Sequence, residues 1–174
     1  MKPPGKKRRG SKQPDTPKIS RARAEGVSVL LDEIRLALEW NRPSILLAVQ
    51  KNKQPLSKAE TVLEESLRAL SHEVIRVDLC KQLSIFPRML FRSPASRQPV
   101  FFFSRLECEA GGGRDVYRAL NLHRETLIEQ HTCGVFWLTS VEAASLVRFA
   151  PDFWAFRHRV VEFAPERNLR NIDR

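Results

Sequence analysis

The sequence predicts an α/β fold, a three-layer sandwich in which helices cover both faces of a five-stranded parallel sheet. Five short apolar runs alternate with segments whose apolar residues recur at helical spacing, and this alternation is typical of parallel sheets. Two of the runs are apolar throughout, as expected of strands buried on both faces. At 174 residues, the chain has the length of one domain with one sizeable core.

The first four elements are expected between residues 24 and 78. A helix over about 24–40 follows from one apolar stripe at helical spacing. The apolar run 44–49 is the first strand. A helix over 57–70 follows, because Ser57 and the glutamate three residues later form a capping box. The run 73–78 is the second strand.

The middle of the chain predicts two further strands and a long helix. Residues 79–98 are irregular in pattern, and their apolar residues indicate a short helix. The run 99–104 is the third strand. The three glycines at 111–113 are expected to form a flexible turn before a helix over 114–130, and the fourth strand is expected at 134–139.

The last elements are two helices and a strand. Ser140 is expected to cap a helix over 140–149, because a hydroxyl accepts hydrogen bonds from backbone N–H groups of the first turn. A short helix over 152–157 and a fifth strand over 158–163 follow. Residues 165–174 are polar and are expected to be a frayed C-terminus, which leaves the folded domain at 24–164.

Residues 1–23 are expected to form a disordered basic tail. They carry nine basic residues and one acid, a charge of +8, whereas residues 24–174 carry 21 basic and 19 acidic residues, a charge of +2. Such a segment buries too little apolar surface to offset its chain entropy. A solvated leader is the simpler interpretation, and contact with nucleic-acid phosphates is the alternative. The residues that would make this contact are Lys6, Lys7, Arg8 and Arg9.

The three cysteines, Cys80, Cys108 and Cys133, are widely spaced and match no metal-binding pattern. We expect buried free thiols in a reducing compartment. No apolar run has the length of a membrane span, and no signal-peptide core follows the basic N-terminus. These observations predict a cytoplasmic protein with no membrane association.

The loop after the first strand lacks the features of a phosphate-binding loop. A nucleotide-hydrolysing enzyme would place a glycine-rich sequence with a lysine here, so that backbone N–H groups wrap the phosphates. Residues 50–57 read QKNKQPLS and contain no glycine, and Pro55 removes one donor. Lys51, Lys53 and Ser57 remain a possible residual anion site, with exposed loop residues as the simpler interpretation.

The loop after the third strand also argues against catalysis. Carboxylates that hold magnesium are expected there, but Ser104 and Arg105 follow the strand, with Glu107 and Glu109 later. An arginine at that position would repel the metal ion. We therefore expect no enzymatic activity, no cofactor and no metal site.

Three motifs give the chain a family resemblance: ALNLHRE at 119–125, VFWLT at 135–139 and APDFWAFR at 150–157. With them, the chain resembles the inactive, P-loop-less AAA+/STAND-type ATPase-like domains of bacterial modular signalling proteins over roughly residues 24–164. The resemblance implies a sheet of the P-loop NTPase type with strand order 5-1-4-3-2. It also implies a scaffold role in signalling or defence assemblies.

The segment 150–157 is a candidate partner-binding surface. It places three aromatic residues within four positions, so they cannot all face one core. Exposed aromatic and arginine residues are typical of binding hot spots, whereas burial against the sheet is the alternative. Two arginines near the segment are expected to be able to pair with its aspartate. The candidate residues are Arg148, Asp152, Phe153, Trp154, Phe156 and Arg157.

Three functions follow from these patterns. The first is a non-catalytic protein-interaction or scaffold module with a degenerate NTPase fold. The second is a nucleic-acid-associated protein that binds phosphates through residues 1–23. The third is a nucleotide binder without turnover. The oligomeric state and the identity of a partner do not follow from the sequence.

Overall fold

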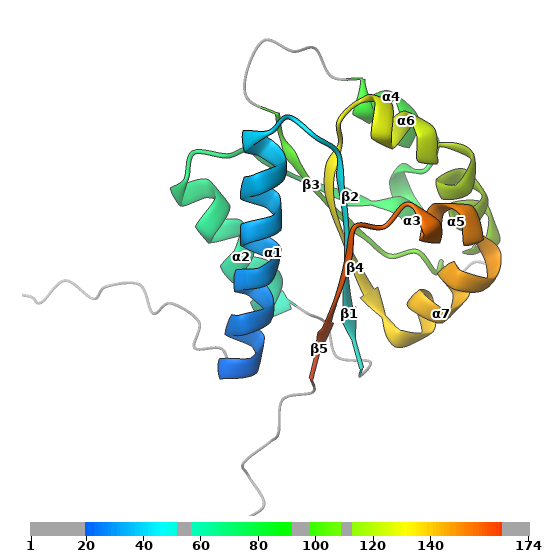
Figure 1. The fold of residues 1–174 in the computed structure, drawn as a ribbon. Coiled ribbons are helices and arrows are strands. Elements are labelled where there is room, and N and C mark those ends of the chain that lie inside the picture. Colours follow the sequence, from blue (N-terminus) through cyan, green and yellow to red (C-terminus); the bar gives the residue numbers. More distant parts are fainter. Residues whose placement is uncertain (1–19, 52–56, 92–97, 109–112, 165–174) are drawn as a thin grey trace, which may run out of the picture.

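The chain folds around one sheet of five parallel strands (Figure 1). The structure is a computed structural model that describes residues 20–51, 57–91, 98–108 and 113–164. Along the sheet the strands follow the order 2-3-4-1-5, which is the predicted order read from the other edge. The fold class is therefore confirmed. The strands are β1 (Ser44–Gln50), β2 (Val74–Asp78), β3 (Val100–Ser104), β4 (Cys133–Thr139) and β5 (Arg159–Phe163).

Helices cover the sheet on both faces (Figure 1). The first two helices lie on one face and the other six on the opposite face. No helix in the described part of the chain is long and apolar enough to cross a membrane. The helices are α1 (Arg21–Glu39), α2 (Ser57–Ala69), α3 (Leu79–Gln82), α4 (Phe86–Leu90), α5 (Gly113–Leu122), α6 (Arg124–Glu129), α7 (Ser140–Phe149) and α8 (Pro151–Ala155).

The sheet separates two apolar cores. Side chains alternate along each strand, so Leu46 and Ala48 of β1 face α1 and α2, whereas Leu47 and Val49 face the other helices. All seven residues of β1 are buried. On the larger side, rings of Phe103, Phe136 and Phe153 pack in series from β3 through β4 to α8. This series fixes α8 against the sheet.

The helix α1 begins earlier than predicted. It starts at Arg21, so the last three residues of the expected tail belong to the helix. Arg23 is only 3% exposed and extends the buried stripe by one turn, because an arginine stem can pack on apolar surface. The helix also lies very close to β5, since a Cβ on Gly26 would stand 2.8 Å from a ring carbon of Phe163. Glycine at this position permits that approach.

The long helix predicted over 114–130 is two helices. It breaks at His123, which begins α6 as its N-cap residue. Arg124 donates a hydrogen bond to the carbonyl oxygen of Asn121 over 2.6 Å, and this oxygen is one that a continuous helix would use internally. The Asn121 side chain in turn accepts from the backbone N–H of Phe153 over 2.9 Å. The break therefore lets the end of α5 hold the start of α8.

His158 fastens the start of β5 to β1. Its ring Nδ1 atom accepts a hydrogen bond from the backbone N–H of Ile45 over 2.9 Å, and the backbone N–H of His158 donates to the Ile45 carbonyl oxygen over 2.8 Å. Burial, followed by the positive charge of Arg42, lowers the pKa of His158, and Glu33 acts in the opposite direction. The ring is therefore held neutral, as an acceptor nitrogen requires.

We predict that acidification destabilises the protein partly through His158. The folded-state pKa lies below the unfolded value of 6.5, so as pH falls below about 6.5 the unfolded chain binds the proton first and stability is lost. His158→Asn keeps an acceptor oxygen but does not titrate. Urea midpoints measured from pH 7.5 to 5.5 should therefore fall less steeply in this variant. Equal slopes in the variant and the parent protein would contradict the assignment.

Candidate functional site

The carboxyl edge of the sheet is the natural place for a ligand in an open parallel sheet. Lys51 is the one residue of the predicted anion site whose side chain the structure describes. Its Nζ lies 2.7 Å from Glu162 Oε2. This links the residue after β1 to the edge strand β5. Lys53 and the side chain of Ser57 lie outside the described residues. The described part of the predicted site is therefore already paired with a carboxylate.

The ends of β2 and β3 carry a second internal ion pair. Asp78 caps α3 by accepting from the backbone N–H of Lys81 over 3.2 Å. Its other oxygen lies 3.2 Å from a guanidinium nitrogen of Arg105. The backbone of Arg105 is left-handed, with φ of 59°, and turns the chain sharply after β3. Arg105 thus lies after β3, where a carboxylate that holds magnesium would be expected, and its positive charge neutralises Asp78.

The expectation of three free thiols is wrong for two of the cysteines. Cys80 and Cys108 form a disulfide with their Cα atoms 5.5 Å apart. They are 28 residues apart in sequence, and it is the pairing of β2 with β3 that brings them together. Cys133 is free and buried, as predicted, and burial raises the pKa of Cys133 to about 12.

A buried glutamate, Glu142, joins the segment after β3 to the start of α7. One oxygen accepts from the backbone N–H groups of Leu106 and Glu107 over 2.8 and 3.3 Å. The other accepts from the backbone N–H and the hydroxyl of Thr139 over 2.8 and 3.0 Å. Thr139, and not the predicted Ser140, is the N-cap, because its backbone is extended and its side chain accepts from the N–H of Glu142.

Glu107, one of the two acids that follow Arg105 in the sequence, is also engaged in hydrogen bonds. It accepts hydrogen bonds from Ser145 over 2.9 Å and from the Tyr117 hydroxyl over 3.4 Å. Burial, as the largest cause, raises the pKa of Tyr117, so this hydroxyl stays a donor. The second acid, Glu109, lies outside the described residues. Within the described ranges, His, Cys, Asp and Glu side chains nowhere gather in threes that could hold a metal ion.

Gln50 differs from these paired groups. It ends β1, is 2% exposed, and neither atom of its amide has a hydrogen-bond partner among the described residues. The indole nitrogen of Trp137 is likewise buried without a described partner. Both side chains face α1 and α2, since they alternate in step with Ala48. An unpaired buried amide costs about 1–3 kcal/mol, so among the described residues Gln50 is a poorly satisfied polar position at this edge.

The predicted partner-binding segment is partly core and partly surface. Phe153 is fully buried, whereas Trp154 and Phe156 are half-buried. Asp152 accepts from the Asn121 amide over 3.1 Å. The expected pairing of Asp152 with Arg148 or Arg157 is not formed. Each of those arginines packs against an aromatic ring instead.

Four arginines lie over three aromatic rings in this region. The guanidinium of Arg157 lies 4.2 Å from the Trp154 ring centre, and that of Arg124 lies 5.9 Å from the Phe156 ring centre. Those of Arg114 and Arg148 lie 5.4 and 5.1 Å from the Phe149 ring centre. We call this set the arginine–aromatic surface. Its residues are Arg114, Arg124, Arg148, Phe149, Trp154, Phe156 and Arg157.

The arginine–aromatic surface was only partly predicted. Sequence reasoning missed Arg114 and Arg124, because they lie on α5 and α6 and meet the 150–157 segment only when the helices pack. It also missed Phe149, which directly precedes the segment, because no pattern in the sequence marks it as the ring under two arginines. Three of the arginines, Arg114, Arg148 and Arg157, form no salt bridge within the described part of the chain. The exposed guanidinium groups of Arg114 and Arg148 can therefore donate to an acidic partner. Arg157 already donates from one nitrogen to the Trp154 carbonyl oxygen over 2.7 Å, and its other N–H groups remain for a partner.

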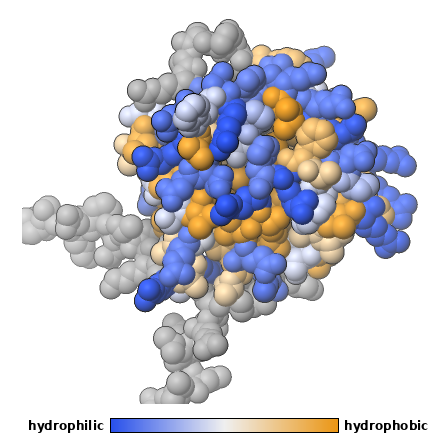
Figure 2. Space-filling view, viewed as in Figure 1, coloured by the Kyte–Doolittle hydropathy of each residue, from blue (hydrophilic) through white to orange (hydrophobic). Residues whose placement is uncertain are grey.

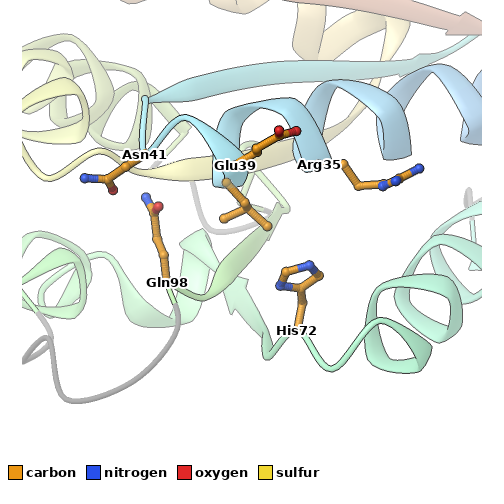
Figure 3. Close-up of a pocket in the computed structure, with 6 residues that line it drawn as sticks. Arg35, Glu39, Asn41, His72 and Gln98 are labelled. Carbon is orange, nitrogen blue, oxygen red and sulfur yellow. The ribbon is translucent and has the colours of Figure 1, made fainter.

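A hollow of about 460 Å³ lies at the opposite, amino edge of the sheet. Figure 3 shows the Gln98 side chain reaching toward Asn41 and the His72 ring near the last turn of α1. Open parallel sheets bind ligands at the other edge, and we assign no ligand to this hollow. Its lining residues are Arg35, Leu38, Glu39, Asn41, His72 and Gln98.

Comparison with known proteins identifies the fold. No protein-family model matches the chain, and no curated protein matches it. Solved structures do match. The Aeropyrum pernix ORC2 protein in ADPNP-ADP complexes aligns with a TM-score of 0.56 at 10% identity, over 85% of this chain and 49% of that chain.

Two further structures agree with this likeness. The Aeropyrum pernix ORC1 protein in complex with DNA has a TM-score of 0.53 at 15% identity, over 88% of this chain and 48% of that chain. Drosophila ORC bound to DNA has a TM-score of 0.50 at 18% identity, over 83% of this chain and 30% of that chain. This chain thus spans half or less of the length of each. The fold is therefore of the P-loop NTPase type.

Proposed function

We propose that this chain is a non-catalytic protein-interaction module, a STAND-type scaffold in a bacterial signalling or defence assembly. The observation that carries the proposal is the Asp78–Arg105 ion pair at the edge where this fold would bind a nucleotide. Phosphate binding needs free donors, and magnesium needs free carboxylates. The Lys51–Glu162 pair supports the same conclusion.

The arginine–aromatic surface supports a role in binding. Arginine and aromatic residues are enriched in binding hot spots. A guanidinium that lies over a ring is held in place by about 0.5–1 kcal/mol at an exposed site, and it keeps its edge N–H groups available for a carboxylate. The surface therefore presents fixed positive donors, which suit an acidic segment of a partner.

A protein partner suits this surface better than a nucleic acid. The rings of Trp154 and Phe156 are half-buried and lie beneath guanidinium groups, so their faces are not open for stacking with bases. Val141 and Val147 of α7 are 53% and 46% exposed. Figure 2 shows apolar side chains among hydrophilic ones on the face that includes α7. Mixed apolar and arginine contacts are typical of protein interfaces.

We predict that the purified full chain neither hydrolyses nor binds nucleotide. Millimolar ATP or ADP with magnesium should leave the thermal midpoint unchanged, because a ligand that binds the folded state raises it. Phosphate release should equal that of Lys51→Ala and Lys53→Ala. Magnesium-dependent hydrolysis lost in Lys53→Ala would contradict the proposal. A thermal shift without hydrolysis would instead favour a nucleotide binder without turnover.

We predict that reversing charge on the arginine–aromatic surface abolishes partner binding without unfolding the domain. Chemical cross-linking in cell extract, followed by affinity purification, should place the partner on α7 and α8. The double variant Arg148→Glu/Arg157→Glu should lose that partner at least about tenfold, which corresponds to roughly 1.4 kcal/mol. The control Arg42→Glu/Arg88→Glu makes the same charge change at exposed positions elsewhere. Cross-links elsewhere, or equal loss in the control, would contradict the assignment.

A second candidate function is nucleic-acid binding through residues 1–23, favoured by their charge of +8. We predict that any DNA or RNA affinity of the full chain falls steeply with salt, because phosphate neutralisation releases counterions. Deletion of residues 1–19, which leaves α1 intact, should remove it. Binding that persists in the deletion would exclude the four tail residues Lys6, Lys7, Arg8 and Arg9 as the contact. Fluorescence anisotropy with a labelled duplex measures both the salt dependence and the effect of the deletion.

A further inference from the structure

A covalent bond ties together the ends of two neighbouring strands. The strands β2 and β3 are paired so that Asp78 lies beside Ser104, where both strands end. Cys80 lies in the first turn of α3 directly after β2, and Cys108 follows β3 by one short segment. Their disulfide therefore joins the two chain segments just as they leave the sheet.

The two bonded cysteines are accessible, unlike the third. Cys80 and Cys108 are both partly exposed, whereas Cys133 is 0% exposed within β4. Thiol exchange requires a thiolate that can reach another sulfur. Small thiols can therefore reach Cys80 and Cys108 in the folded protein. They cannot reach the buried Cys133, which serves as an internal control.

The segment after β3 has a bonding arrangement for either redox state. The Sγ atom of Cys80 lies 3.1 Å from the carbonyl oxygen of Arg105. A disulfide sulfur carries no proton, but a reduced Cys80 thiol could donate a hydrogen bond to that oxygen. Reduction would thus replace a covalent tie with a weak hydrogen bond, without leaving the thiol unpaired.

The other side of this segment stays fastened without the disulfide. The backbone N–H groups of Leu106 and Glu107 donate to Glu142 of α7. Among the described residues, the disulfide and the Arg105–Asp78 ion pair link the segment to β2 and α3. Loss of the disulfide therefore loosens one side of the segment selectively.

We propose that Cys80 and Cys108 form a redox latch that ties residues 104–108 to α3 when oxidised and releases them when reduced. The oxidant is a low-molecular-weight disulfide such as glutathione disulfide. One cysteine thiolate attacks it, forming a mixed disulfide and releasing one glutathione thiolate. The second cysteine then displaces the other glutathione. Two electrons pass to glutathione disulfide, and the two cysteine protons end on the two glutathione thiols formed.

The first test measures whether the bond responds to a cellular range of redox conditions. The full chain is equilibrated with varied ratios of reduced to oxidised glutathione, then alkylated with iodoacetamide and analysed by mass spectrometry. Cys80 and Cys108 should become alkylated together as reduced glutathione increases, while Cys133 stays protected. A bond that persists in large excess of reduced glutathione, or that never forms in oxidised glutathione, would overturn the latch.

The second test measures whether the bond controls the segment. Amide hydrogen exchange of Arg105 and Cys108 should be at least about tenfold faster in the reduced than in the oxidised full chain. The amides of Leu106 and Glu107, which donate to Glu142, and those of β1 and β4 should be unchanged. Cys108→Ser should resemble the reduced state in either buffer, and Cys133→Ser should keep the difference. Equal exchange in the two redox states of the parent protein would overturn the proposal, whether or not Cys108→Ser folds.

Discussion

The structure depends on the burial of its central strands on both faces. All seven residues of β1 are buried, and six of the seven in β4 are buried as well. A strand of this kind can be stable only if helices cover both sides of the sheet, since apolar area returned to water costs about 25 cal/mol per Å². The two helical layers, the parallel connections and the two separate cores all follow from this requirement. The ring series from Phe103 to Phe153 extends it to α8.

Because the strands are parallel, their carboxyl ends meet at one edge, and the chain must satisfy the polar groups that gather there. In this protein it does so internally. Asp78 is paired with Arg105, Lys51 with Glu162, and Glu142 with two neighbouring backbone segments. These contacts stabilise the loops, but they also occupy the donors and carboxylates that nucleotide chemistry requires. Internal stability of the edge and the proposed absence of catalysis thus share one cause.

Much of the fold could be predicted from the sequence, because apolar periodicity records which faces are buried. All five strands were predicted within two residues of their ends. The break at His123 could not be predicted, since one of the contacts beside it, from the Phe153 N–H to the Asn121 side chain, forms only when α8 packs against α5. The disulfide was missed because cysteine spacing does not reveal which strands are neighbours. The sequence does signal the cap at Thr139, as a threonine with a glutamate three residues later, but the adjacent Ser140 is also a residue type that caps helices.

The arrangement of α7 connects the two sites proposed for this chain. Its first turn holds the segment after β3 through Glu142, and its last turn carries Arg148 and Phe149 of the arginine–aromatic surface. Arg148 lies six positions after Glu142, or about 9 Å along a helix at 1.5 Å per residue. A helix this short moves as one body, so a shift of the segment that Glu142 holds would be passed to Arg148. Packing of α7 against α5 and α8 opposes such a shift, and the balance between these contacts and the disulfide decides whether the redox state of Cys80 and Cys108 reaches the partner surface.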